Sequence, residues 1–245
     1  MEAIETFTID TGTETLAADR IAVRGKVQCL LLHGAGMSTR VRWLPLRTAL
    51  AQHGVGTVAI DFSGHGDSSS RTEGSLEKRF DEALLALEHI DADGPRVVVG
   101  ISMSGEIAVR LAVDKATHIS GVVTIVGAAY DPAAYQIPFG PEFTRILRSH
   151  ESWRKSEVFS AIQSFRGRIA VIQAGNDEVV PGMIGSDLIR NASCAEHAEL
   201  LVLPGVSHAL ANALDDNPKM TQDVARAIAR TIRVKRMPAI REATA

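Results

Sequence analysis

Short apolar runs recur along the chain, and each is bounded by glycine, aspartate or proline. The runs are nearly continuous in valine, isoleucine, leucine and alanine and do not alternate with polar residues. Continuous runs of this kind are typical of strands buried on both faces of a sheet. We therefore predict six buried strands, at residues 28–32, 57–61, 96–100, 121–126, 169–173 and 198–203.

Helical patterns lie between these runs. The segment 75–90 opens with Ser75 and keeps an apolar stripe through Leu76, Phe80, Leu84 and Leu87. Further helices are predicted over 41–54, which ends in a glycine, and over 220–236. Strands that alternate with helices predict an α/β fold, in which helices cover both faces of a mostly parallel sheet.

The first 25 residues follow a different pattern. The stretches IETFTID and ETLAADRIAV have strand character, and a threonine- and glycine-rich turn separates them. This arrangement predicts an antiparallel hairpin at one edge of the sheet, which brings the expected number of strands to eight.

About forty residues separate the predicted strands 121–126 and 169–173, which is more than a simple crossover helix needs. We expect a short lid at about residues 128–165, inserted into a single domain over 1–245. The alternative is a longer surface crossover that does not gate the site.

Composition narrows the function classes. The chain has 245 residues, 45% of them hydrophobic, and a net charge of −3, which disfavours a nucleic-acid-binding protein. Its basic cluster RVKRMPAIR, at 233–241, reads as a solvated tail.

No apolar run reaches the ~18 residues of a membrane span, and the acidic N-terminus does not resemble a signal peptide. With only two cysteines, Cys29 and Cys194, a reducing cytoplasmic setting fits best.

Two serines follow the strand at 96–100, in the frame Gly100-Ile101-Ser102-Met103-Ser104-Gly105. A nucleophile on a strand-to-helix elbow needs small residues two positions before and after it, because the turn is tight. Ser102 has Gly100 and Ser104 at these positions, whereas Ser104 has Ser102 and the large Glu106. Ser102 is therefore the favoured nucleophile, and Ser104 is the alternative.

A catalytic serine needs a base and an acid that orients the base. Asp177 follows the strand at 169–173, and His208 follows the strand at 198–203. Both positions share the carboxyl edge of the sheet with Ser102, in the chain order serine, acid, histidine. We predict a triad of Ser102, Asp177 and His208, with Glu178 as the competing acid.

The loop His33-Gly34-Ala35-Gly36 directly follows a predicted strand. Glycines there allow backbone N–H groups to approach a substrate, so we predict an oxyanion hole from the N–H groups of Ala35 and Met103. The alternative is a simple strand-to-helix turn. A phosphate-binding loop is disfavoured because no Gly-Lys-Ser/Thr follows.

These motifs together resemble the α/β-hydrolase family. The stretch AIDFSGHGDSSS, at 59–70, is similar to the Asp-x-x-Gly-His-Gly-x-Ser signature of that family. With HGAG, it resembles the branch of monoglyceride-lipase-like, serine-aminopeptidase-like and cinnamoyl-esterase-like enzymes. The resemblance covers roughly residues 4–233. It implies an α/β-hydrolase fold with a mostly parallel eight-stranded sheet and a short lid, and structural roles for Asp61 and His65.

The sequence departs from the family pattern at two positions. Ile101 stands where a histidine often precedes the nucleophile, and Ser104 stands where the pattern has glycine. Neither change removes a predicted catalytic group. Dehalogenases and epoxide hydrolases of the family carry aspartate as the nucleophile, so Ser102 argues against those activities.

Aromatic residues are concentrated in the first part of the predicted insert, where five of the eleven in the chain fall between residues 128 and 153, namely Tyr130, Tyr135, Phe139, Phe143 and Trp153. They are candidate substrate-binding residues that would form an apolar wall for the acyl or alcohol group. Equally, they could pack the insert onto the body of the protein. The remaining histidines have no ligand-like spacing, so no metal site is predicted.

The sequence predicts a serine hydrolase for carboxylic esters or thioesters of small to medium apolar or aromatic acyl groups. The mechanism requires no metal and no organic cofactor, and the expected partner is a small-molecule substrate. Two alternatives stay open at this point. One is acyl transfer or lyase chemistry with the same triad, and the other is a binding protein without turnover.

Overall fold

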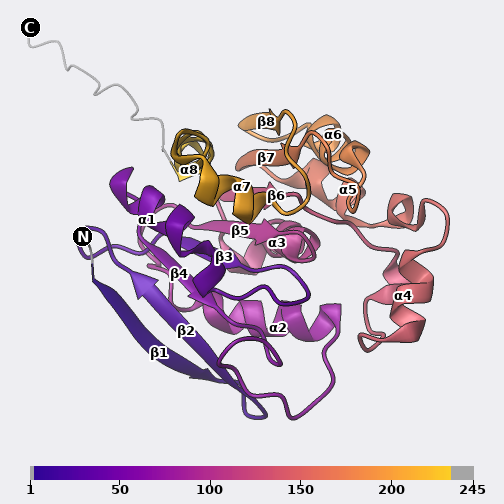
Figure 1. Ribbon diagram of the computed structural model, residues 1–245, viewed down its shortest axis with the longest axis horizontal. Coiled ribbons are helices and arrows are strands. Elements are labelled where there is room, and N and C mark those ends of the chain that lie inside the picture. The colour runs from indigo at the N-terminus through magenta and orange to yellow at the C-terminus, as the bar shows by residue number, and fades with distance from the viewer. Residues whose placement is uncertain (1–2, 233–245) are drawn as a thin grey trace, which may run out of the picture.

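A computed structural model describes residues 3–232, so the predicted tail at 233–241 lies outside the described residues. In this part of the chain an eight-stranded sheet has the order β1-β2-β4-β3-β5-β6-β7-β8 (Figure 1). Strands β3 to β8 are parallel, as predicted. The strands are β1 Ile4–Asp10, β2 Thr15–Ile21, β3 Cys29–Leu32, β4 Thr57–Ile60, β5 Val97–Ile101, β6 Gly121–Ile125, β7 Arg168–Ala174 and β8 His197–Leu203.

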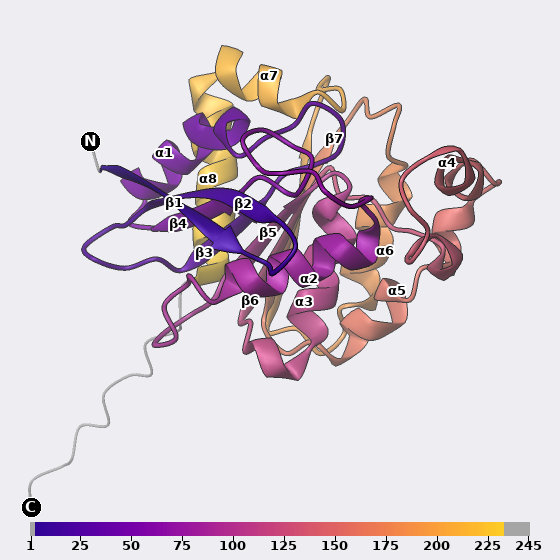
Figure 2. The same ribbon diagram turned by 90° about the horizontal axis from the view of Figure 1, so that it is seen from below.

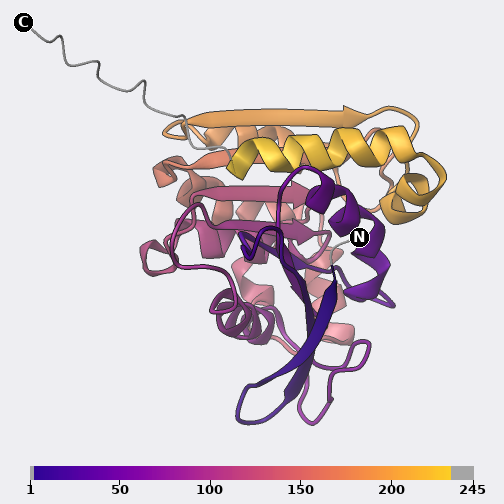
Figure 3. The same cartoon turned by 90° about the vertical axis from the view of Figure 1, so that its left-hand side faces the viewer.

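The predicted edge hairpin is confirmed. Strands β1 and β2 pair antiparallel from Ile4–Ile21 to Asp10–Thr15, and β2 pairs antiparallel with β4. In Figure 3 this hairpin extends away from the stacked parallel strands.

Helices cover both faces of the sheet. Apolar side chains of α1, α7 and α8 form a core with one face, and those of α2, α3 and α6 form a core with the other. The helices are α1 Leu44–Gln52, α2 Leu76–Leu87, α3 Ser104–Val113, α4 Pro141–Leu147, α5 Val158–Ala161, α6 Gly182–Asn191, α7 Leu210–Asp216 and α8 Pro218–Ile232. Short 3₁₀ helices cover Val41–Trp43, Lys115–Thr117, Pro132–Ala134, Ser152–Lys155 and Ile162–Ser164.

The buried side of α2 differs from the predicted stripe. Ser75 caps the helix as expected, and its Oγ accepts a hydrogen bond from the Lys78 N–H at 3.0 Å. However, Phe80 and Leu84 are only partly buried, whereas Arg79 and Glu82 are buried. The stripe was wrong in this detail because polar partners compensate for burying these two charged groups: the Ser63 N–H donates to Glu82 at 3.1 Å, and the contacts of Arg79 are described below.

Strand β8 is the second exception to the predicted pattern. As the last strand of the sheet, it leaves Leu200 and Val202 substantially exposed, in alternation with half-buried neighbours. The expectation of burial on both faces was wrong here, because the elements within residues 3–232 leave this face of the edge strand largely exposed.

The segment between β6 and β7 contains α4, α5 and three of the short 3₁₀ helices, at the place of the predicted insert 128–165. Figures 1 and 2 both place α4 at the side of the molecule away from α7.

Candidate active site

Ser102 lies on a sharp turn between β5 and α3. Its φ is 49°, a left-handed conformation that is uncommon for a residue with a side chain. Its N–H donates to the carbonyl of Ile125 at 2.9 Å, which ties the turn to the end of β6. A side chain at Gly100 would overlap the backbone of Ser104, so the turn requires glycine at that position.

Three side chains from three loops meet at this turn. Ser102 Oγ lies 3.0 Å from His208 Nε2. His208 Nδ1 lies 2.8 Å from Asp177 Oδ2 and 3.0 Å from Oδ1. Asp177 follows β7 and His208 follows β8, so the carboxyl edge of the sheet brings all three predicted residues together. In the tautomer with its proton on Nδ1, His208 donates a hydrogen bond to Asp177. Nε2 is then unprotonated and can accept the proton of Ser102.

The backbone holds the carboxylate of Asp177 in place. Its Oδ1 accepts hydrogen bonds from the N–H groups of Val179 and Val180, at 2.9 and 2.8 Å. The competing acid Glu178 is exposed, and within residues 3–232 it makes no hydrogen bond to His208. Asp177 is therefore the carboxylate whose position is fixed against the imidazole.

Ser104, the alternative nucleophile, is completely buried and faces a different group. Its Oγ donates to the carbonyl of His33 at 2.6 Å. The serine that stands where the family pattern has glycine thus links the start of α3 to the loop after β3.

That loop lies directly against Ser102. A Cβ at Gly34 would lie only 3.0 Å from the Cβ of Ser102, so the glycine permits this close approach. Among the residues described, the N–H groups of Ala35 and Met103 have no acceptor in the chain. Two free donors beside a serine side chain are what an oxyanion hole requires.

A cavity of about 420 Å³ opens beside the triad, between the loop after β3 and the start of α7. Ser102, His208 and Ala35 line it, and most of its other lining is apolar. The apolar lining comes from Met37, Trp43, Ile101, Val126, Val179, Ala209, Leu210 and Ala211. Met37 is 98% exposed at the rim, so it offers apolar surface that a bound ligand would cover.

The five aromatic residues of the insert that were candidates for substrate binding do not line this cavity. Tyr130, Phe143 and Trp153 are buried, and the ring of Phe143 packs edge-on against Phe139 at 4.9 Å. Tyr135 lies under the guanidinium of Arg110 at 4.2 Å, in a groove between α2, α3 and the insert. The geometry favours the interpretation in which these rings pack the insert onto the body.

A buried network of charged groups supports the loops around the site. Asp61, fully buried, accepts the Arg40 N–H at 2.6 Å and forms an ion pair with the Arg40 side chain. Arg40 also pairs with Asp19 at 3.0 Å, and Asp19 pairs with the buried Arg47. These contacts agree with a structural role for Asp61. Neither Arg40 nor Arg47 belongs to a recognisable motif, so sequence reasoning did not identify them.

Two histidines near the site are held neutral. His33 Nε2 accepts the Phe62 N–H at 3.1 Å, so the ring proton lies on Nδ1, which donates to the Gly34 carbonyl at 2.7 Å. Burial and the positive charge of Arg79 hold the pKa of His33 well below its usual value. The same two causes lower the pKa of His65.

Neither a metal-binding cluster nor a membrane-spanning helix occurs within the described residues. There, no group of three or more histidine, cysteine, aspartate or glutamate side chains could hold a metal ion. None of the helices in residues 3–232 has the length and apolar character needed to span a bilayer.

Residues 29–177 match a protein family described as the alpha/beta hydrolase family. No curated protein matches the sequence. Solved structures do match in fold. Est1E from Butyrivibrio proteoclasticus, solved with ferulic acid bound, has a TM-score of 0.69 and 16% identity, over 91% of this chain and 96% of Est1E. A putative hydrolase from Agrobacterium vitis S4 has a TM-score of 0.68 and 22% identity, over 94% of this chain and 100% of that hydrolase. The monoacylglycerol lipase of Paleococcus ferrophilus has a TM-score of 0.65 and 17% identity, over 88% of this chain and 97% of that lipase.

Proposed function

Because the chain belongs to the α/β-hydrolase family, we propose that it is a serine hydrolase that cleaves carboxylic esters or thioesters. One observation carries this proposal: the continuous contact from Ser102 Oγ to His208 Nε2 and from His208 Nδ1 to Asp177. These residues have the chemistry of a nucleophile, a general base and an orienting acid.

In the first half of the reaction, His208 Nε2 removes the proton of Ser102 as Oγ attacks the carbonyl carbon of the substrate. The negative charge that develops on the carbonyl oxygen is stabilised by the N–H groups of Ala35 and Met103. The bond to the leaving alkoxide or thiolate then breaks, and His208 returns the proton to it. The product is an ester between the acyl group and Ser102.

In the second half, His208 removes a proton from water, and the hydroxide attacks the acyl carbon. The bond to Ser102 Oγ breaks, the serine takes the proton from His208, and the free acid leaves. Asp177 holds the imidazole in one tautomer and stabilises it while it is positively charged. Each step uses groups that lie at the site.

The cavity supports a preference for small to medium apolar or aromatic acyl groups. A volume of about 420 Å³ and a largely apolar lining suit a group of that size better than a long acyl chain. The exposed Met37 and Val179 at its rim would be covered by an apolar substrate. A cytoplasmic location stays a prediction from the sequence.

A panel of nitrophenyl esters of increasing acyl length tests both parts of the proposal, with Ser102→Ala as the control. We expect hydrolysis that depends on Ser102, is highest for short to medium acyl groups and declines for long ones. A steady rise towards long chains would contradict the preference. Failure to hydrolyse any ester or thioester would contradict the function and favour the binding protein.

A further inference from the structure

Arg79 of α2 is a buried arginine that makes no direct ion pair with a carboxylate among the described residues, although the charge of Glu82 is near enough to act on it. It is only 3% exposed, and among the described residues its guanidinium forms no ion pair with an aspartate or glutamate. Burial lowers its pKa to about 10, so it is charged at neutral pH. Because a buried charge without a direct ion pair is costly, its other contacts must compensate.

The contacts of Arg79 lead to the loop beside Ser102. One guanidinium nitrogen donates to the Gly34 carbonyl at 3.2 Å and lies 3.4 Å from the His33 carbonyl. The other donates to Nε2 of His65 at 3.1 Å. The rings of Phe62 and Phe139 lie 4.5 and 5.5 Å from the charge, within the range of cation–π attraction.

Both carbonyls in this loop therefore have two donors. The His33 carbonyl faces Ser104 Oγ and Arg79, and the Gly34 carbonyl faces Arg79 and the His33 ring. In a planar trans peptide the N–H points opposite to the C=O. With the Gly34 carbonyl held against Arg79, the N–H of Ala35 faces the other way, towards the cavity that Ala35 lines with Ser102.

We propose that Arg79 is a positioning residue, which fixes the Gly34–Ala35 peptide so that the Ala35 N–H is aimed at the oxyanion. The proposal rests on the proposed function and deepens it. A charged donor on the Gly34 carbonyl also polarises the peptide, which strengthens its N–H as a donor. Arg79 itself does not touch the reacting atoms.

Arg96 is a matched control for Arg79. It also donates to two backbone carbonyls, those of Leu87 and Thr117, both at 2.7 Å. However, it precedes β5, whereas Ser102 follows that strand, so it lies at the opposite edge of the sheet. Loss of Arg96 should affect stability without affecting the oxyanion hole.

The experiment compares Arg79→Met and Arg79→Lys with Arg96→Met and Arg96→Lys. The substrate is the nitrophenyl ester that the wild type hydrolyses fastest, and a trifluoromethyl ketone of the same acyl group reports on tetrahedral-adduct stability. Loss of an oxyanion donor costs about 10²–10³ in kcat, so we expect Arg79→Met to lower kcat by roughly 10- to 100-fold, with KM little changed. The ketone should bind more weakly by a similar factor.

Arg79→Lys keeps the positive charge but loses the planar guanidinium with its several fixed donors. Its kcat should therefore lie between those of Arg79→Met and the wild type. Both Arg96 variants should keep wild-type kcat per folded molecule. If Arg79→Met does not fold, the comparison of the two lysine variants decides, and equal kcat values would overturn the proposal. An unchanged kcat in folded Arg79→Met would also overturn it, as would a loss confined to KM.

An active wild type with unaffected Arg79 variants would leave the hydrolase function standing and refute the positioning role alone. A wild type that hydrolyses no ester or thioester would refute the proposed function, and the positioning role with it.

Discussion

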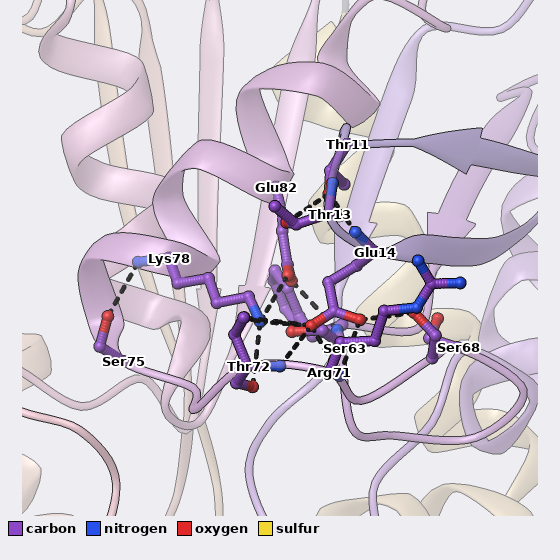
Figure 4. A network of polar contacts seen from close by, with 12 residues as sticks. Thr11, Thr13, Glu14, Ser63, Ser68, Arg71, Thr72, Ser75, Lys78 and Glu82 are labelled. Carbon is purple, nitrogen blue, oxygen red and sulfur yellow. Dashed lines mark hydrogen bonds and ion pairs between the residues drawn. The ribbon is translucent and has the colours of Figure 1, made fainter.

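Two polar clusters of this protein contain the same kinds of group, a carboxylate and its hydrogen-bond donors, but differ in role. At the triad, Asp177 accepts two backbone N–H groups and orients His208, which faces Ser102 at the edge of a cavity. At the turn of the edge hairpin, Glu14 is 1% exposed and accepts hydrogen bonds throughout its carboxylate (Figure 4). Its donors are the Ser69 hydroxyl, the Arg71 and Thr72 N–H groups, the Thr72 hydroxyl and the Lys78 ammonium.

The difference lies in what is left unsatisfied. The donors around Glu14 are directed at its carboxylate, so the cluster fixes the segment between β4 and α2 and offers nothing to a ligand. At the triad, Ser102 Oγ borders a cavity, and the N–H groups of Ala35 and Met103 have no acceptor within residues 3–232. A polar cluster becomes reactive where the fold leaves such groups facing open space.

The largest effect should follow from removing the Ser102 hydroxyl. Ser102→Ala should lower kcat by roughly 10⁵- to 10⁶-fold, as when a catalytic serine is removed from a comparable triad. Circular dichroism and thermal melting should show an intact fold. Ser104→Ala is the matched control, because it removes the hydrogen bond to the His33 carbonyl without touching His208. If Ser104→Ala proved the more damaging change, Ser102 would not be the nucleophile.

The next largest effect should come from the acid. Asp177→Asn should lower kcat by roughly 10⁴-fold, because the amide favours the wrong tautomer of His208. Glu178→Gln, one position along the same loop, should leave ester hydrolysis near the wild-type rate. The reverse order of effects would move the role of the acid to Glu178.

A smaller effect is expected at Gly34, where the loop approaches the nucleophile. Gly34→Ala would place a methyl group 3.0 Å from the Cβ of Ser102, so either the serine or the loop must shift. We expect kcat to fall by roughly 10- to 100-fold, since small displacements of catalytic groups have effects of this size. Gly36→Ala is the control for backbone strain alone. Gly36 has a φ of 68°, which disfavours alanine, but a methyl group there would meet no atom within 4 Å. Equal losses in the two variants would contradict the close-approach argument.

The smallest effect on activity, but a clear one on stability, is expected at Glu14. Its hydrogen bonds, led by that from Ser69, hold the pKa of Glu14 well below the usual 4.5. A carboxyl with a lowered pKa stabilises the fold above its unfolded pKa, and this contribution is lost as the pH falls below about 4.5. Glu14→Gln should therefore lower the melting temperature by a few degrees at pH 7.

The gap in melting temperature between Glu14→Gln and the wild type should narrow steadily below pH 4.5, while kcat at pH 7 stays near the wild-type value. A gap that is independent of pH would show that the charge of Glu14 does not contribute.

Much of the candidate site could be predicted because it depends on strand ends. The apolar runs before Ser102, Asp177 and His208 are parallel strands, and their carboxyl ends meet at one edge whatever the details of packing. The order of these residues along the chain and the small residues around Ser102 then separate them from ordinary loop residues.

Side chains whose direction depends on tertiary packing could not be predicted. Arg79 lies on a helix whose apolar positions indicated a different buried stripe. Its burial is explained by tertiary contacts with the carbonyls of the loop after β3, with His65 and with the rings of Phe62 and Phe139. The aromatic residues of the insert have no regular period that would say which way they point. Their concentration in the sequence was real, but three of the five are buried in the core.

The most direct test of Ser102 as the nucleophile is covalent labelling by a fluorophosphonate probe, followed by peptide mapping. We expect one adduct, on Ser102, that is absent in Ser102→Ala, forms slowly in Asp177→Asn and is retained in Ser104→Ala. An adduct on Ser104, or no adduct on a folded wild-type protein, would contradict this role of Ser102.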